Sequence, residues 1–364
     1  MILSACLLAR NEAPRIGRAI KSIRQHVQEV VVLDTGSDDD TMEVARGAGA
    51  DVIISEPERT VDLGDGFRSL GDFAAARNRV MGAASGDFLL VVDADHIFVP
   101  PTFLAIREAM KRDHICAAAL LYHIATSQKA KPLDVVTGKK RIGQPHQSPA
   151  LLRAHKTDRE YYYGIIHEVP TAWEERRIAE GMKHGVLRDS RIADYGHEPG
   201  IRAAIGKDER NRRLLELAIK RTPDDPVPYT YLAAMYLATG DEDRCENLCA
   251  DVYPKIGKDT RLAGSHLLRL CATMGLLWFR RGVPDLAWQS ARIWEQHDGR
   301  AHPDVDLVKG LACELWGKTE EAKVFYRAST TRSADAVGSQ HILNNIAGER
   351  LAVLGAGKPL VMAG

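Results

Sequence analysis

The chain is 364 residues long, enough for two domains that each bury a core of their own. Lysine plus arginine and aspartate plus glutamate each total 49, and this zero net charge argues against a protein devoted to coating nucleic acid or an anionic membrane. Six cysteines without a CxxC pair, and the lack of a secretory leader or an apolar run of transmembrane length, predict a cytoplasmic protein with free thiols and no integral membrane association.

Strand and helix signals alternate through the first half of the chain. Strands are predicted at 2–9, 29–34, 51–55 and 87–95, and helices at 15–26, 41–50 and 69–86. Strand–helix alternation with short connections predicts right-handed crossovers and a mostly parallel sheet.

Charged and polar side chains follow three of these strands at the point where each strand ends. They are Arg10, Asn11 and Glu12 after the first strand, Asp34 at the end of the second, and Asp93 and Asp95 at the end of the fourth. Ligands of open α/β sheets bind outside the carboxyl ends of the strands, so these side chains predict one site.

The Asp93-X-Asp95 pair suits a divalent cation, because Mg²⁺ and Mn²⁺ prefer hard oxygen ligands. A cation held by so few carboxylates completes its shell with substrate phosphates and water. The plainer alternative is that one aspartate caps the next helix and the other is a solvated loop residue. Two carboxylates at the end of a buried strand also require a positive charge nearby, since burying them uncompensated is costly.

Four segments in chain order resemble the family 2 glycosyltransferases of the GT-A fold: "LLARNEAPRIGRAIKSI", "EVVVLDTGSDDDTMEVARGAGADVI", "FAAARNRVMGAASGDFLLVVDAD" and "YYYGIIHEVP". The resemblance covers roughly residues 1–200 and is greatest to bacterial members that carry tetratricopeptide repeats after the transferase domain. It implies a nucleoside-diphosphate sugar as donor, with a UDP-sugar expected, Mn²⁺ or Mg²⁺ as cofactor, and transfer with inversion at the anomeric carbon.

The same resemblance implies roles for individual residues. Arg10, Asn11 and Glu12 would line the nucleotide pocket, and Asp34 would contact the base or ribose. Arg77 would approach the sugar or diphosphate side, and Asn78 would help to orient it. Asp93 would bind ribose or metal-bound water, and Asp95 would ligate the metal beside Asp93. For Arg77 the alternative is a surface position on its helix, paired with Asp72 or Asp87.

Glu168, in the segment "YYYGIIHEVP", would be the residue that acts on the acceptor in the implied reaction. An inverting transfer needs a base that takes the proton of the acceptor nucleophile, or at least a carboxylate that orients it. The alternative is that His167 and Glu168 only begin a loop before Pro170, with His167 hydrogen-bonded in the core.

Two positions depart from the family pattern. Where relatives commonly have His-Tyr-Gly, this chain has Asp-Tyr-Gly-His at 194–197, so the third metal ligand is either Asp194 or His197. His96 follows the aspartate pair, where an acid is commoner. The basic segment at 129–159 is expected to lack regular structure and to form either a mobile flap over substrate phosphates or a solvated surface loop.

Strand signals vanish after Lys207. The predicted order is a GT-A domain at 1–205, a linker helix at 206–222 and tetratricopeptide-like helical repeats at 223–364. Three repeats, each burying its face on its neighbour, are marked by the turn glycines Gly240, Gly282 and Gly317. Cys245 and Cys249 occupy small-residue packing positions, so we expect them in the core rather than on a metal.

The sequence therefore predicts an inverting, metal-dependent glycosyltransferase whose repeats serve a partner, the acceptor or a homodimer contact. The acceptor stays open among a peptide, a glycan, a lipid-linked glycan and a modified nucleic acid. The alternative from another class is a catalytically idle nucleotide-sugar-binding scaffold whose repeats bind a partner. A nucleotidyltransferase would need a glycine-rich phosphate loop after the first strand, which "ARNEAPRIG" does not provide.

Overall fold

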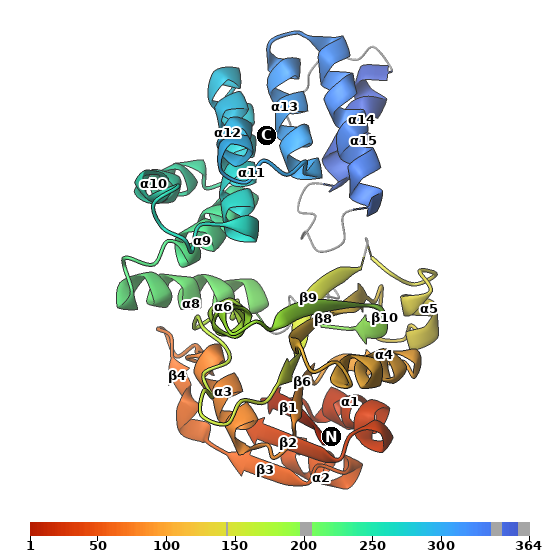
Figure 1. Cartoon of the computed structure of the whole chain (residues 1–364). Coiled ribbons are helices and arrows are strands. Elements are labelled where there is room, and N and C mark those ends of the chain that lie inside the picture. Colours follow the sequence, from red (N-terminus) through yellow and green to blue (C-terminus); the bar gives the residue numbers. More distant parts are fainter. Residues whose placement is uncertain (143–144, 197–205, 336–343, 356–364) are drawn as a thin grey trace. The chain divides into compact units, whose positions relative to one another are not determined.

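The computed structural model describes residues 1–142, 145–196, 206–335 and 344–355 (Figure 1). The chain forms two compact units, Met1–Leu214 and Leu215–Gly364, and the boundary between them falls inside helix α8 (Lys207–Arg221). The segment boundaries predicted at 205 and 222 stay predictions. Over the described ranges, no helix has the length and apolar character that a membrane crossing requires.

A single large sheet forms the centre of the first unit. Its strands along the described chain are β1 (Leu3–Ala9), β2 (Glu29–Asp34), β3 (Val52–Ser55), β6 (Phe88–Asp93), β7 (His96–Phe98), β8 (Ile115–Ile124), β9 (His146–Arg153) and β10 (Lys183–Asp194). They are ordered β3-β2-β1-β6-β9-β8-β10-β7. The neighbours β3, β2, β1 and β6 run parallel, as does the pair β8 and β10, whereas β9 and β7 are antiparallel to their neighbours. The predicted mostly parallel α/β architecture is confirmed.

Helices flank the sheet, and a short hairpin accompanies it. The helices are α1 (Ala13–Ile23), α2 (Thr41–Ala48), α3 (Phe73–Ala83), α4 (Pro101–Met110), α5 (Pro132–Val136) and α6 (Thr171–Ala179), and the hairpin consists of β4 (Thr60–Asp62) and β5 (Arg68–Leu70). In α1 the residues at helical spacing, Ile16, Ala19, Ile20 and Ile23, are all fully buried. The apolar periodicity read from the sequence therefore marks the face that packs on the core.

Strand register brings the ends of β1, β2 and β6 to one edge of the sheet. Ala9, the last residue of β1, lies opposite Asp34, the last residue of β2. Leu8 lies opposite Asp93, the last residue of β6. The polar residues that follow these strands therefore lie next to one another, where ligands of parallel sheets bind.

Strand β9 shows that the expectation of an irregular loop at 129–159 is wrong. Leu151 and Leu152 are fully buried and pair with β6 on one side and with β8 on the other. Between them and Pro149 the register shifts by one residue, which forms a bulge opposite β8. Proline is tolerated in a sheet at such a bulge, so Pro149 does not exclude a strand here.

The second unit is a set of paired helices. Its described helices are α9 (Val227–Ala238), α10 (Glu242–Val252), α11 (Gly264–Arg280), α12 (Pro284–His297), α13 (Pro303–Leu315), α14 (Thr319–Asp335) and α15 (Asn344–Gly355). The turns of the first three pairs pass through the predicted glycines Gly240, Gly282 and Gly317, which adopt φ values of 82°, 69° and 74°. Cys245 and Cys249 are buried in the core of this unit, as expected.

Two further glycines allow neighbouring helices of this unit to approach closely. A Cβ on Gly275 of α11 would lie 2.4 Å from Val308 of α13, and a Cβ on Gly310 of α13 would lie 2.5 Å from the ring of Tyr326 of α14. Tyr326 is fully buried and donates a hydrogen bond to Glu314 at 2.6 Å. Its ring therefore has little freedom to move aside.

We expect Gly310→Ala to lower the melting temperature, because overpacking a filled core costs about 1–3 kcal/mol. Gly348→Ala in α15 is the matched control, since nothing lies within 4 Å of a Cβ at that position. Alanine in an open helical position should stabilise the protein by about 0.5–1 kcal/mol relative to glycine. Thermal unfolding followed by far-ultraviolet circular dichroism measures both variants. Equal melting temperatures for the two variants would show that the close approach at Gly310 does not matter.

Candidate active site

Arg10 and Asn11 follow β1 and bind backbone groups of neighbouring segments. The Arg10 guanidinium donates to the carbonyl oxygens of Gly36, at 3.4 Å, and Arg68, at 2.8 Å. Asn11 has a positive φ of 54°, and its side-chain oxygen accepts a hydrogen bond from the N–H of Asp38 at 2.8 Å. Both residues thus join the end of β1 to the loop after β2. Their predicted place in a nucleotide pocket remains a prediction.

Asp34 is buried and closes the turn that follows β2. Its carboxylate accepts hydrogen bonds from the N–H groups of Gly36 and Ser37, both at 3.0 Å, and from the Ser37 hydroxyl. These contacts hold the loop in a fixed conformation at the edge of the sheet. The predicted contact of Asp34 with a base or ribose would have to be made in addition to these hydrogen bonds.

Among the residues that follow β1, Glu12 is the one whose pKa the aspartate pair affects. Its carboxylate accepts a hydrogen bond from Arg15 at 2.6 Å. Burial raises the pKa of Glu12, Arg15 opposes this effect, and the charges of Asp95 and Asp93 raise the pKa further. The ends of β1 and β6 therefore belong to one electrostatic environment, as the sequence predicts.

Arg77 of α3 supplies the positive charge that the aspartate pair requires. Its Nη2 lies 2.9 Å from Oδ1 of Asp93, and its Nε lies 2.8 Å from Oε1 of Glu168. The guanidinium also lies over the ring of Tyr162, 5.7 Å from its centre. One buried cation thus joins a carboxylate at the end of β6 to a carboxylate 75 residues later in the sequence (168 − 93).

The charges in this cluster stabilise one another against burial. Burial disfavours the charged guanidinium, but Asp93 and then Glu168 outweigh that effect and raise the pKa of Arg77. Burial likewise disfavours the charged carboxylate of Asp93, but Arg77 and then His96 hold its pKa well below the usual range. A third nitrogen of Arg77, Nη1, is buried and has no hydrogen-bond partner among the described residues. Arg77 and Asp93 are therefore both held in their charged forms, and Arg77 has one N–H donor left over.

The alternative partners of Arg77 are engaged elsewhere. Asp72 caps α3 by accepting a hydrogen bond from the N–H of Ala75 at 2.8 Å. Asp87 accepts a hydrogen bond from the N–H of Ile2 at 2.7 Å. The interpretation of Arg77 as a surface residue paired with either aspartate is therefore wrong.

Asp93, Asp95 and His96 form the described cluster that could hold a metal ion, with one ligand atom from each lying within 4.8 Å of the others. His96 Nε2 lies 3.8 Å from a carboxylate oxygen of each aspartate. Gly196 leaves room for this cluster, because a Cβ there would lie 1.9 Å from Oδ2 of Asp95. Two carboxylates and an imidazole are a donor set that fits Mn²⁺ or Mg²⁺.

His96 is the residue of this cluster that the sequence analysis did not propose as a ligand. Its position directly after the aspartate pair was the available signal, and it was read only as a departure from the family pattern. Asp194, at the end of β10, lies opposite His96 in the strand register and accepts a hydrogen bond from the N–H of Gly196 at 2.9 Å. The described cluster does not include Asp194, and the other predicted third ligand, His197, lies outside the described residues.

Burial raises the pKa of Asp95. His96 opposes this effect, whereas the charges of Asp194 and Asp93 add to it. Three carboxylates therefore lie close enough to repel one another at the ends of β6 and β10. A divalent cation would relieve this repulsion, which is the electrostatic reason to place one here.

Glu168 lies on a closed loop between Tyr163 and Val169, which exchange two backbone hydrogen bonds of 3.1 Å. Gly164 and His167 permit the tight path with φ values of 93° and 54°. Helix α3 holds this loop from one side at three points. The N–H of Phe73 donates to the carbonyl of Ile165 at 3.0 Å, the amide of Asn78 makes two bonds of 2.9 and 2.8 Å to the backbone of Tyr162, and Arg77 binds Glu168 itself.

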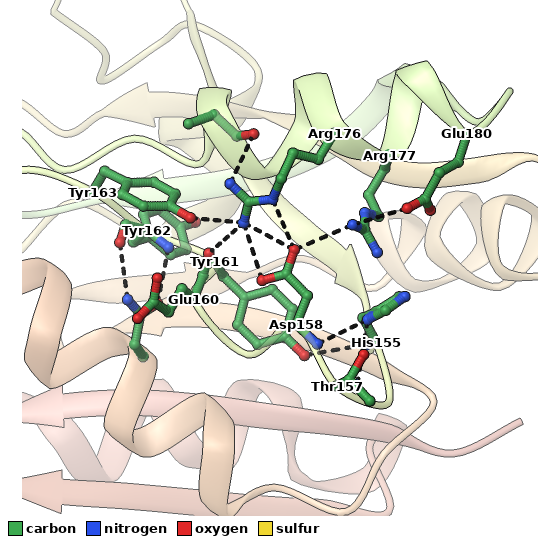
Figure 2. A network of polar contacts seen from close by, with 12 residues as sticks. His155, Thr157, Asp158, Glu160, Tyr161, Tyr162, Tyr163, Arg176, Arg177 and Glu180 are labelled. Carbon is green, nitrogen blue, oxygen red and sulfur yellow. Dashed lines mark hydrogen bonds and ion pairs between the residues drawn. The ribbon is translucent and has the colours of Figure 1, made fainter.

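Helix α6 holds the same segment from the other side (Figure 2). Arg176 donates to both carboxylate oxygens of Asp158, at 2.9 and 3.0 Å, and to the hydroxyl of Tyr163 at 2.7 Å. Arg177 adds a contact of 3.2 Å to Asp158. Glu168 is therefore fixed in direction, with a side chain only 12% exposed and bound to Arg77. The alternative that it merely begins a loop does not describe this geometry.

Comparisons with known proteins agree with this geometry. The profile of Glycosyl transferase family 2 matches residues 4–173. A TPR repeat-containing protein of Synechococcus elongatus is 34% identical over 243 residues, which are 66% of this chain and 53% of that protein. The SPbeta prophage-derived glycosyltransferase SunS of Bacillus subtilis is 22% identical over 77% of this chain and 60% of its own length. The chain thus spans little more than half the length of these curated relatives.

Among solved structures, glucosyl-3-phosphoglycerate synthase from Mycobacterium tuberculosis, in complex with Mn²⁺, UDP and glucosyl-3-phosphoglycerate, is 19% identical. The match has a TM-score of 0.35 and covers 60% of this chain and 80% of that one. The family match itself covers Asp93, Asp95 and His96, the whole of α3 and Glu168. The match to the profile of Glycosyl transferase family 2 therefore lies within the first unit of this chain.

Proposed function

We propose that this chain is an inverting, metal-dependent glycosyltransferase that moves a sugar from a nucleoside-diphosphate sugar, with a UDP-sugar expected, to an acceptor nucleophile. The observation that carries the proposal is the Arg77 bridge between Asp93 and Glu168. The bridge brings the carboxylate expected at the donor together with the carboxylate expected at the acceptor. The family match over residues 4–173 supports the same reaction class.

In this proposal Asp93, Asp95 and His96 hold Mn²⁺ or Mg²⁺, and Asp194 or His197 completes the set from the protein. The departing nucleoside diphosphate gains negative charge, and a cation beside its phosphates stabilises that charge where it develops. Arg10, Asn11, Glu12 and Asp34 form the strand ends against which the nucleoside is proposed to lie. Asn78 keeps the adjoining backbone of Tyr162 in place.

Glu168 is proposed to act on the acceptor. The Arg77 guanidinium binds the Glu168 carboxylate at 2.8 Å and fixes its direction. We therefore place Glu168 as the group that orients the nucleophile and receives its proton as the new bond forms. The acceptor itself, and a homodimer through the helical repeats, are further parts of the proposal that concern the second unit.

A second candidate function is a catalytically idle scaffold that binds a nucleotide sugar while its repeats bind a partner. The observation that favours it is that Arg77 satisfies both carboxylates without any ligand, as a purely structural ion pair would. Release of free sugar from a UDP-sugar in the presence of Mn²⁺ separates the two candidates, because a scaffold would bind the donor and leave it intact.

Replacing the proposed metal ligand tests the donor side. Asp95→Asn should lower the rate of donor hydrolysis or transfer by roughly 10³-fold, because charge stabilisation by a metal supplies several kcal/mol. Kinetics at saturating donor measure the effect, and Asp113→Asn, an exposed position, is the matched control. Near-normal activity of the Asp95 variant, with the control also active, would remove Asp95 from the metal site.

Replacing Glu168 tests the acceptor side of the proposed reaction. Glu168→Gln keeps a hydrogen-bond acceptor for Arg77, so UDP and Mn²⁺ should still bind with wild-type affinity in calorimetric titrations. The transfer rate should fall by roughly 10²-fold or more, as expected for a lost general base. Loss of UDP binding in this variant would instead give Glu168 a purely structural role on the donor side.

A further inference from the structure

The first half of helix α8, which lies where the linker helix at 206–222 is predicted, is part of the first unit. Lys207, Arg210, Asn211 and Leu214 are spaced three, four and seven residues apart, so they share one helix face. Asn211 is 8% exposed and Leu214 is fully buried. This face of the helix is therefore covered by protein and does not line a solvated connection.

Arg213 fixes the first half of α8 to the β4–β5 hairpin. Its guanidinium donates to the carbonyl oxygens of Leu63 at 3.3 Å and Gly64 at 2.6 Å, and it pairs with Asp65 at 3.2 Å. The same guanidinium lies over the ring of Phe67 at 5.3 Å. All of these partners lie in the first unit, so the position of this half-helix is set within the transferase domain.

Arg210 extends from this half-helix to the residues that hold Glu168. Its guanidinium lies 5.3 Å from the ring centre of Phe73, the first residue of α3, and the N–H of Phe73 binds the loop that carries Glu168. Burial lowers the pKa of Arg210, and the charge of Glu168 offsets part of that effect. The guanidinium is therefore close enough to Glu168 for the two charges to interact.

Arg210 has no carboxylate partner among the described residues. Its recorded hydrogen bonds, at 3.2 and 3.0 Å, both go to the neutral side-chain oxygen of Asn211. Lys207, one turn earlier on the same helix face, makes no ion pair within the described parts of the chain. A largely buried guanidinium without a counter-ion is unfavourable, so this pair of cations calls for an anion.

We propose that Arg210 and Lys207 bind the phosphates of the nucleotide sugar, so that the first half of α8 is a wall of the active site. The inference rests on the proposed function. A guanidinium matches two phosphate oxygens with parallel N–H donors, and a lysine adds a mobile point charge. Arg210 lies against Phe73, whose N–H binds the loop that carries Glu168, and Lys207 is one turn earlier on the same helix face, so both cations would meet the charge that grows on the leaving diphosphate.

Nucleotide affinity of the full chain in the presence of Mn²⁺ tests the inference. We expect Arg210→Gln and Lys207→Gln each to weaken the binding of UDP about tenfold or more, as for lost hydrogen bonds to a charged group. The affinity for uridine, measured by competition with UDP, should change less than about twofold, because uridine has no phosphate. Arg212→Gln is the matched control, since Arg212 lies on the same helix and binds Glu209.

The outcomes separate this inference from the proposed function. Wild-type affinity of both variants for UDP, while the wild-type chain binds UDP, would overturn the inference alone. Equal weakening of UDP and uridine would also overturn it, because the change would then act through the fold. Failure of the wild-type chain to bind UDP, GDP, CDP or dTDP would overturn the proposed function and this inference with it. Melting temperatures within a few degrees of wild type show that the variants are folded.

Discussion

The guanidinium of Arg77, held between Asp93 and Glu168, is the interaction on which the site depends. Arg77 and Glu168 have side chains only 11% and 12% exposed, and charges buried to this degree are tolerated only where their geometry is close to ideal, so the end of β6, helix α3 and the loop at 163–169 must keep their relative positions. The two carboxylates and one guanidinium still leave one negative charge, and Asp95 adds another. This excess of carboxylates is the reason that a cation is proposed at the site.

Much of the fold could be predicted because its signals are local. The apolar runs of β1, β2 and β6 end in polar residues, and Gly240, Gly282 and Gly317 mark turns where a positive φ is required. Strand β9 could not be found in this way. Its sequence mixes glutamine, serine and proline with a short apolar run, and it becomes a strand only because β6 and β8 offer it two open edges.

For the site, the types of residue present could be predicted better than the contacts that each residue makes. The aspartate pair indicated that a positive charge must lie nearby. That Arg77 supplies this charge depends on how α3 lies across the strand ends. Asp34 and Arg10 were expected to face a nucleotide, and the structure shows that Asp34 binds the backbone of its own loop and that Arg10 binds backbone carbonyls of neighbouring segments. Such contacts follow from loop conformation, which the pattern of residue types does not specify. Arg210 was not predicted as a site residue, because a helix between two regions is expected only to connect them.

The continuity of α8 restricts how this protein can be recombined with its relatives. The helix runs from Lys207 to Arg221, while the first unit ends at Leu214. A chimaera joined at residue 205 would receive the first two turns of α8 from the repeat donor, together with whatever cations that donor carries there. If Arg210 and Lys207 bind the nucleotide sugar as proposed, an exchange of the repeat region at this junction would also alter affinity for the sugar donor. An exchange that keeps the first unit whole would have to be joined after Leu214, in the middle of α8.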